Sequence, residues 1–226
     1  MSLLTRIVVT FLAGAGLFVI LPLVAWGPAD LAGFVANPER VGYVILVLVL
    51  NGIAAVRSPE FGKSRETPRL SHSRQHAVVV FLQILSTALV LVGPFCDARD
   101  IAVFPQSESL RASGLALYCG GFLLMHFAQM ALGRQFSVEV AIQERHTLVT
   151  TGLYSRIRHP RYLGIILFTF GISFTFRSII SSILSFLVVI VLLWRIREEE
   201  LFMSREFGPD WQSYLERSWR LVPFIY

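Results

Sequence analysis

The chain has 226 residues, of which 54% are hydrophobic and only 15% are charged, and its formal net charge is +5. A soluble domain carries roughly a quarter charged residues, so this composition excludes an ordinary soluble protein and indicates a single integral membrane domain spanning residues 1–226. The basic residues are distributed over short segments between apolar runs, which is unlike a nucleic-acid-binding surface.

Apolar runs define the predicted elements, because a helix needs about 18 or more apolar residues to cross a bilayer. We find six candidate spans, at residues 4–26, 41–56, 77–95, 113–132, 162–174 and 179–194. The first run lacks a small-residue cleavage pattern and is interpreted as a retained span rather than a signal peptide. The last two runs are short and nearly adjacent, so they predict a helical hairpin with a tight turn at 176–178. The predicted fold is an all-α polytopic membrane protein with about six transmembrane helices.

The distribution of basic residues predicts the orientation of the chain in the membrane. Sixteen of the twenty Lys and Arg residues lie at the start of the first span, after the second, after the fourth or beyond the sixth. Only four lie on the other side: Arg40, Arg99, Arg111 and Arg177. Because cytoplasmic segments carry the excess of Lys and Arg, we expect both termini to face the cytoplasm.

The segment 152–164 concentrates polar chemistry between two apolar runs. It contains three arginines, one histidine and two tyrosines, namely Arg156, Arg158, Arg161, His159, Tyr154 and Tyr162. His159 precedes Pro160 and is biased away from helical geometry, whereas proline suits the first turn of a helix. A helix is therefore expected to begin at Pro160, with its unpaired amides available to an anion.

A second polar group follows the sixth span, where Arg195, Glu198, Glu199 and Glu200 return to the same membrane face. Arg195 and Glu199 are four residues apart and should share one helix face. Three consecutive carboxylates need facing cations, which the segment 152–164 could supply. The alternative is a solvated helix end whose charges only terminate the span.

An anion-binding helix start, a carboxylate and apolar walls suit S-adenosylmethionine. Its carboxylate would lie near Pro160, its positive groups near a glutamate, and its adenine against Leu148 and Val149. A nicotinamide dinucleotide or a lipid headgroup fits the same features. Cys96 and Cys119 are expected to be unpaired thiols, and no Cys/His or acidic spacing predicts a metal site.

Several sequence elements resemble the isoprenylcysteine carboxyl methyltransferase family, whose wider group includes membrane phospholipid N-methyltransferases. They are 146–149, 151–154, the Arg-His-Pro-x-Tyr-x-Gly segment 158–164, the Glu199–Glu200 pair, 207–208, Tyr214 and 220–223. The match covers roughly residues 132–223, so the resemblance implies a catalytic core at 111–226 and leaves the spans within 1–110 without a role.

The resemblance implies site residues position by position. The residues that would bind S-adenosylmethionine are Gln143, His146, Thr147, Leu148, Val149, Tyr154, His159, Pro160, Arg161, Tyr162, Glu199 and Glu200. Arg195 and Glu199 would be catalytic. Glu199 would face the positive end of the cofactor, and Arg195 would bind the substrate.

The implied enzyme is an S-adenosylmethionine-dependent methyltransferase with a cytoplasmic cofactor pocket and no metal. Its substrate would be a lipophilic carboxylate, such as an isoprenylated cysteine, that enters from the bilayer. The implied location is the plasma membrane of a prokaryote or the endoplasmic reticulum of a eukaryote. Methylation of a phospholipid amine or a thiol, a nicotinamide-dependent membrane reductase and a small transporter are the alternatives. A transporter should show repeat symmetry and polar residues at the membrane midplane, and only Asn51 and Gln83 are such residues.

Overall fold

The computed structural model describes residues 2–57, 72–133 and 148–226, and these residues are almost entirely helical. The α-helices are α1 (Leu3–Ala15), α2 (Leu21–Trp26), α3 (Leu31–Val35), α4 (Pro38–Arg57), α5 (His72–Arg99), α6 (Glu108–Leu132), α7 (Pro160–Thr175) and α8 (Ile179–Leu215). Shorter helical segments are η1 (Gly16–Ile20), η2 (Pro28–Asp30) and η4 (Gly152–Ser155). The all-α prediction is confirmed.

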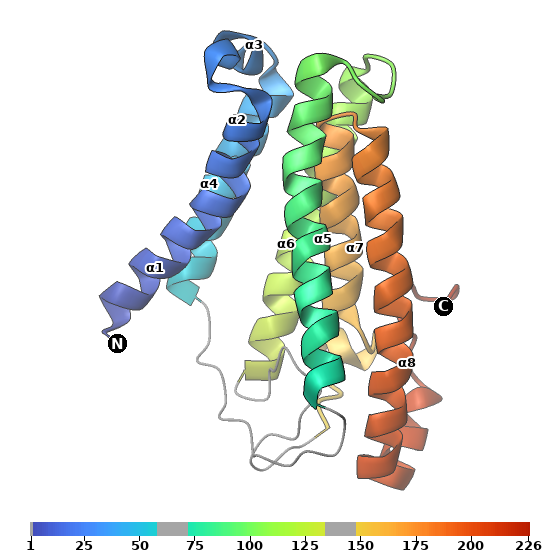
Figure 1. Cartoon of the computed structure of the whole chain (residues 1–226). Helices are drawn as coiled ribbons and strands as arrows, with labels where there is room; N and C mark the ends of the chain where they lie inside the picture. Colours follow the sequence, from blue (N-terminus) through green and yellow to red (C-terminus); the bar gives the residue numbers. More distant parts are fainter. Residues whose placement is uncertain (1, 58–71, 134–147) are drawn as a thin grey trace.

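The helices run up and down between two ends of the bundle (Figure 1). The start of α1, the ends of α4 and α6, the starts of α5 and α7 and the last part of α8 lie toward one end, drawn at the bottom. The short helix α3, the connection from α5 to α6 and the turn from α7 to α8 lie at the other end. Arg57, the last residue of α4, and Arg161, in the first turn of α7, therefore belong to the end drawn at the bottom.

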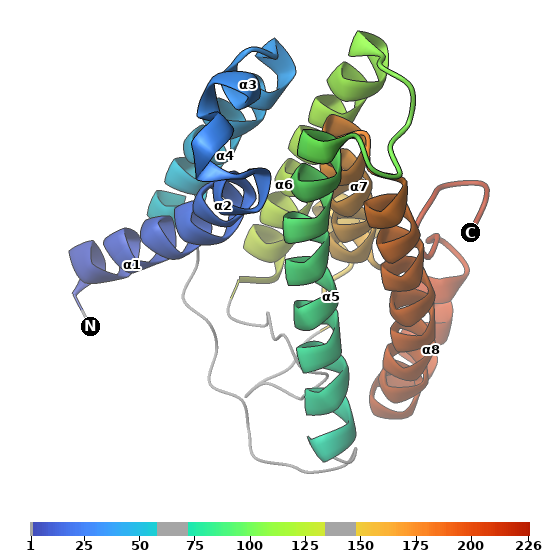
Figure 2. The ribbon, with the colours of Figure 1, turned by 45° about the horizontal axis from the view of Figure 1, so that its top comes forward.

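The first predicted span is one rod built from three helical segments. The helix α1 continues through the π-helical turn η1 into α2, where the backbone reverses at Gly27 with φ +119°. After α3, the helix α4 returns beside this rod (Figure 2). This N-terminal part meets the remaining helices through buried aromatic residues.

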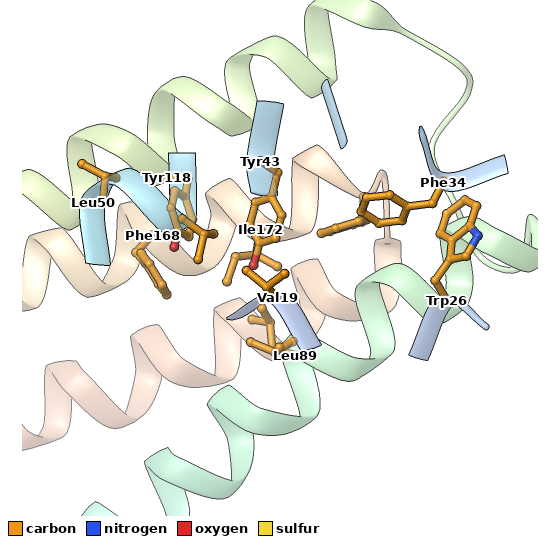
Figure 3. Close-up of a cluster of buried hydrophobic side chains, with 12 residues drawn as sticks. Val19, Trp26, Phe34, Tyr43, Leu50, Leu89, Tyr118, Phe168 and Ile172 are labelled. Carbon is orange, nitrogen blue, oxygen red and sulfur yellow. The ribbon is translucent and has the colours of Figure 1, made fainter. Parts of the chain in front are cut away.

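The junction between the two parts is a cluster of buried apolar side chains (Figure 3). Tyr43 of α4 packs edge-on against Tyr118 of α6 and Phe176, with both ring centroids 5.2 Å away. Tyr118 in turn lies 4.5 Å from Phe168 of α7. Aromatic rings bury large apolar areas, so this cluster joins α4 to α6 and α7 through apolar packing.

Two pairs of glycines allow α6 and α7 to pack with their backbones in contact. Gly114 and Gly121 of α6 face Gly171 and Gly164 of α7, respectively. A Cβ atom at Gly121 would lie 2.5 Å from the Phe168 amide nitrogen, which leaves no space for any other residue. Such small-residue contacts drive helix association in membranes through close packing. They fix the position of α7 and hence of its first residue, Pro160.

The predicted hairpin is confirmed, since α7 ends at Thr175, α8 begins at Ile179 and Phe176 and Ser178 flank the turn. Five helical segments are long and apolar enough to cross a membrane: Leu3–Trp26, Pro38–Arg57, His76–Arg99, Glu108–Leu132 and Ile179–Leu215. The predicted fifth span is α7, whose 16 residues fall short of that length. The count of six therefore remains a prediction, as does the division of the chain at residue 110.

A buried carboxylate fastens the end of the bundle opposite α7's start. Asp97, whose side chain is fully buried, receives both terminal nitrogens of Arg111 at 2.8 Å and Nε of Arg177 at 3.0 Å. Arg40 Nε lies 3.6 Å from the same carboxylate. Three of the four basic residues assigned to the outer side are thus gathered around one aspartate. We refer to Asp97, Arg40, Arg111 and Arg177 as the Asp97 centre.

The helix α8 is the longest element and bends before its end. Gly208 has φ +49° and ψ −118°, which only glycine adopts easily, and Pro209 follows it. The last residues of α8 turn back along the bundle and lead into the segment 216–226. This bend brings the C-terminal segment against the start of α7.

Candidate active site

The helix start at Pro160 is confirmed, because α7 begins there and His159 has the non-helical angles φ −123° and ψ 55°. The amides of Tyr162 and Leu163 both donate to the His159 carbonyl, at 3.1 and 3.2 Å. These two amides are consequently not available to an anion. The anion site expected at this helix start therefore has two fewer amide donors than the sequence suggests.

A hydroxyl bridge connects α7 to α8 at the charged end of the hairpin. Tyr162 donates from its hydroxyl to Glu199 Oε2 at 2.7 Å and accepts from Arg195 Nε at 2.9 Å. Arg195 and Tyr162 are buried, whereas Glu199 is partly exposed. The shared helix face predicted for Arg195 and Glu199 is confirmed, and we refer to these three residues as the Tyr162 bridge.

Glu200 points into a separate group of cationic side chains. Its Oε1 accepts from Arg158 Nε at 2.9 Å and lies 3.4 Å from His159 Nε2. Its Oε2 accepts from Arg220 Nε at 2.7 Å. Both oxygens of this buried carboxylate are occupied, so Glu200 is better placed to hold Arg158 and His159 than to bind a ligand directly. We refer to Glu200, Arg158, His159 and Arg220 as the Glu200 centre.

The two groups touch through aromatic stacking. The rings of His159 and Tyr162 lie nearly parallel, with centroids 5.5 Å apart and an interplanar angle of 14°. His159 thereby links the Glu200 centre to the Tyr162 bridge. A change in one group is expected to move the other.

The C-terminal segment completes the site, although none of its residues was among the expected site residues. Ile157 pairs with Trp219 in a single parallel bridge. The Arg158 amide donates to the Trp219 carbonyl at 2.7 Å, and the His159 amide donates to the Arg220 carbonyl at 3.0 Å. Arg158 also bonds to the carbonyl of Ser218. Residues some 60 positions apart thus form one polar wall, and no local pattern in the sequence indicates this pairing.

Tyr154 is held between three elements. Its hydroxyl donates to the Ala128 carbonyl of α6 at 3.4 Å, and its own carbonyl accepts from the Tyr214 hydroxyl at 2.6 Å. Burial raises the pKa of the Tyr154 phenol above its usual range, Glu199 raises that pKa further, and Arg161 lowers it. The phenol is therefore neutral near pH 7 and lies within electrostatic reach of the Tyr162 bridge.

The remaining predicted site residues are only partly accounted for. Leu148 and Val149 are partly buried and directly precede the segment that forms η4. Gln143, His146 and Thr147 lie outside the described residues. Among residues 2–57, 72–133 and 148–226, no group of three or more His, Cys, Asp or Glu side chains could hold a metal ion.

The arrangement can position a negatively charged substrate and a positively charged cofactor next to each other. Arg195 is a buried cation that donates from Nε to the Tyr162 hydroxyl. Glu199 is a carboxylate at the exposed side of the same bridge. A cation and an anion separated by one hydroxyl group are suited to orienting two oppositely charged reactants.

Comparisons with known proteins place these residues in a family context. The model of the isoprenylcysteine carboxyl methyltransferase family matches residues 114–205, which include most of α6, all of α7 and the first part of α8. The protein-S-isoprenylcysteine O-methyltransferase B of Arabidopsis thaliana is 33% identical over 133 residues, covering 56% of this chain and 67% of the relative. A probable protein-S-isoprenylcysteine O-methyltransferase of Oryza sativa subsp. indica is 29% identical over 167 residues, covering 68% of this chain and 85% of the relative.

A solved structure supports the fold. The eukaryotic intramembrane Ras methyltransferase, an isoprenylcysteine carboxyl methyltransferase, superposes with a TM-score of 0.54 at 22% identity. The superposition covers 93% of this chain and 74% of that protein. Most of the N-terminal part formed by α1–α4 is therefore included in the shared architecture, although the family model begins only within α6.

Proposed function

The chain belongs to the isoprenylcysteine carboxyl methyltransferase family and is an integral membrane methyltransferase, and from this premise we propose its reaction. It transfers a methyl group from S-adenosylmethionine to the carboxylate of an isoprenylated cysteine or a similar lipophilic acid. The lipophilic part of the substrate enters from the bilayer, and the carboxylate is bound at the Tyr162 bridge. The observation that supports this most strongly is the pairing of Arg195 with Glu199 through one hydroxyl.

The two glutamates have different environments, and this difference supports S-adenosylmethionine as the methyl donor. Glu200 is enclosed by Arg158, His159 and Arg220, whereas Glu199 is partly exposed and bonds to Tyr162. A cofactor with an ammonium and a sulfonium group would find a suitable carboxylate in Glu199. Leu148 and Val149 provide an apolar contact for its adenine. When bound, S-adenosylmethionine supplies an electrophilic methyl group.

The chain's own residues contribute by positioning. A substrate carboxylate is already nucleophilic when ionised, so the site requires no general base. Arg195 would keep this carboxylate ionised and aimed, and the Tyr162 hydroxyl fixes the direction of the Arg195 Nε bond. Holding two reactants in line contributes up to about 7–11 kcal/mol to lowering a barrier, so geometry alone is sufficient for a large rate effect.

We propose that the end of the bundle carrying this site faces the cytoplasm. The ends of α4 and α6 and the starts of α5 and α7 lie toward this end (Figure 1), and the adjoining segments carry most Lys and Arg residues. A soluble cofactor reaches the site from the cytoplasm. In a eukaryotic host this membrane would be the endoplasmic reticulum, and in a prokaryotic host the plasma membrane.

Calorimetric titration of the purified protein tests the cofactor. S-adenosylmethionine and S-adenosylhomocysteine should both bind, whereas NADPH should not. Binding of NADPH without binding of the two adenosyl compounds would contradict the proposed methyl donor and indicate a reductase.

Substitutions test the site. Glu199→Ala should weaken S-adenosylmethionine binding by at least about tenfold, which corresponds to about 1.4 kcal/mol. Glu206→Ala is the matched control, because Glu206 is exposed and lies seven residues further along the same helix. Equal cofactor affinity in the two variants contradicts the assignment of Glu199.

The role assigned to Arg195 predicts that its replacement affects turnover and cofactor affinity differently. Arg195→Ala should lower turnover strongly while changing cofactor affinity little, because Arg195 is assigned to the substrate carboxylate. The reverse pattern, with affinity lost and turnover kept, shows that the assigned roles of Arg195 and Glu199 must be exchanged.

Labelled methyl transfer identifies the acceptor. Prenyl-cysteine analogues with a free carboxylate should be methylated, and the corresponding amides should not. Methylation of a phospholipid amine or a small thiol, with the carboxylate analogues inert, rules out the proposed acceptor.

A further inference from the structure

The residues after α8 form a tight turn with an unusual outer surface. The amides of Leu221 and Val222 both donate to the main-chain oxygen of Tyr226, at 2.9 and 3.1 Å, which closes the turn. Phe224 has φ +68° within it and is 86% exposed, and Ile225 is 80% exposed. Trp219 is also exposed, and its ring centroid lies 5.3 Å from that of Phe224. Three large apolar side chains therefore point away from the protein at one place.

The turn packs against the membrane-spanning part of α8. Leu221 is buried in the same apolar cluster as Val188, Leu192 and Ile196 of α8 and Leu85 of α5. In both views, the segment lies on the outer side of α8 and well short of its lower end (Figures 1 and 2). The residues of α8 in this cluster extend from Val188 in the apolar run to Ile196, which follows Arg195 where charged residues begin. The turn is thus level with the boundary between the apolar and charged parts of α8.

The charges around the turn suit the headgroup region of a bilayer. Arg156 and Arg217 are both exposed and flank the segment in the fold, since the Arg156 carbonyl accepts from the Trp219 amide at 2.8 Å. Arg220 lies over the Tyr226 ring at 5.2 Å. Trp and Tyr are enriched at membrane interfaces, and arginines there attract anionic lipid phosphates.

The same segment is bonded to the site. The carbonyls of Trp219 and Arg220 accept from the amides of Arg158 and His159, and the Arg220 side chain binds Glu200. Any force that holds Trp219 in place also holds Arg158 and His159 beside Glu200.

We propose that residues 219–226 form a membrane-interface anchor that stabilises the Glu200 centre. Phe224, Ile225 and Trp219 enter the boundary between lipid headgroups and acyl chains beside α8, and Arg156 and Arg217 contact lipid phosphates. Burial in the bilayer keeps the segment paired with residues 157–159. The anchor does not depend on the identity of the methyl acceptor, and it is tested without measuring activity.

Spin labels measure the depth of the turn in vesicles that contain anionic lipid. In a chain with Cys96→Ala and Cys119→Ala, a labelled cysteine is placed at Ile225, at Ile190 or at Glu216. Ile190 is 62% exposed within the α8 span and marks the hydrocarbon, whereas the exposed Glu216 marks the aqueous side. The accessibility of the label at 225 to oxygen and to a water-soluble nickel chelate should be intermediate between those of the labels at 190 and 216. A label at 225 that is as accessible to nickel as the label at 216 contradicts the anchor, as does one shielded from both reagents by protein.

Hydrogen exchange tests the connection to the site in the same vesicles. Phe224→Ser with Ile225→Ser removes the apolar surface of the turn, whereas Phe224→Trp with Ile225→Leu retains it at the same positions. The amides of Arg158, His159 and Trp219 should lose protection in the serine variant and keep it in the Trp/Leu variant. Equal protection in both variants rules out stabilisation of the Glu200 centre by the bilayer.

Discussion

The two ends of the bundle each hold a buried carboxylate surrounded by cations, yet the two arrangements serve different purposes. Asp97 contacts Arg111, Arg177 and Arg40. At the other end, Glu200 contacts Arg158, His159 and Arg220. Composition alone does not distinguish these groups, since each has one acidic residue and three residues that are cationic or can become so.

The groups that adjoin each centre distinguish them. Arg111 also donates to the Thr175 carbonyl at the end of α7, at 2.6 Å, and Arg177 donates to the Phe104 carbonyl at 2.9 Å. The Asp97 centre therefore supplies hydrogen bonds to main-chain carbonyls at the end of α7 and in the loop before α6. Its Asp97, Arg111 and Arg177 side chains are buried. An open hollow of about 500 Å³ lies beside it, but Arg177 is already bonded to both Asp97 and Asp100 there.

The Glu200 centre instead supports a neighbour that is partly exposed. His159 stacks on Tyr162, whose hydroxyl joins Arg195 to Glu199. Both oxygens of the Glu200 carboxylate are already bonded, so Glu200 can fix the positions of its partners. The partly exposed Glu199 can then face a ligand. The Glu200 centre thus adjoins the proposed site through the His159 ring, whereas the Asp97 centre connects helix ends, a loop and the exposed Asp100.

The largest effect should follow from Asp97→Ala, because breaking a buried ion pair leaves uncompensated charges and costs about 3–5 kcal/mol. The thermal midpoint in detergent should fall strongly, and activity should fall only in proportion to the folded fraction. Asp100→Ala is the control, since the Asp100 side chain is 78% exposed and should change stability little. A normal midpoint for Asp97→Ala would show that this end of the bundle does not depend on the cluster.

Glu200→Gln should have the next largest effect, with a loss of stability of about 1–3 kcal/mol from weakened bonds to charged partners. In contrast to Asp97→Ala, activity per folded molecule should also fall, because Arg158 and His159 lose their fixed positions. Comparing turnover with the folded fraction measured by the same unfolding curve separates the two effects. Unchanged turnover per folded molecule would make Glu200 a purely structural residue like Asp97.

Tyr162→Phe should leave the fold intact and lower turnover by at least roughly tenfold, because the hydroxyl bonds to both Glu199 and Arg195 and each hydrogen bond to a charged group contributes about 1.5 kcal/mol. The ring still stacks on His159, so only the bridge between Arg195 and Glu199 is removed. The check is to compare the steady-state kinetics of Tyr162→Phe with those of Tyr154→Phe, which also removes one phenol hydroxyl. Unaltered turnover excludes the bridge from the reaction.

The smallest effect is expected for Arg220→Ala, because the Arg220 side chain is 36% exposed and partly exposed pairs contribute at most about 1 kcal/mol. Arg158 and His159 still contact Glu200 in this variant. Arg158→Ala, which removes a more deeply buried partner, should cost more in the same thermal assay. The opposite order would make the C-terminal segment, rather than the residues just before α7, the main support of Glu200.

Much of the site could be predicted because the decisive features are local. The proline after His159 sets the start of α7, and the spacing of four between Arg195 and Glu199 places both on one helix face. The pairing of Trp219 with Ile157 could not be predicted, since a single bridge between distant residues leaves no periodic pattern. Similarly, the four outer arginines suggested only a charge bias, and nothing in their spacing indicated that three of them meet at Asp97.

The sequence by itself determined the membrane class, the helical hairpin and the polar composition of the site, because hydrophobic run length, proline position and helix periodicity act within a few turns of one chain. Only the tertiary structure decided how the two adjacent glutamates differ. The close approach of α6 and α7 at their glycines and the bend at Gly208 bring Arg158, His159 and Arg220 onto Glu200 and leave Glu199 with Tyr162. Neighbours in sequence acquire different roles because helix geometry turns their side chains about 100° apart, toward different partners.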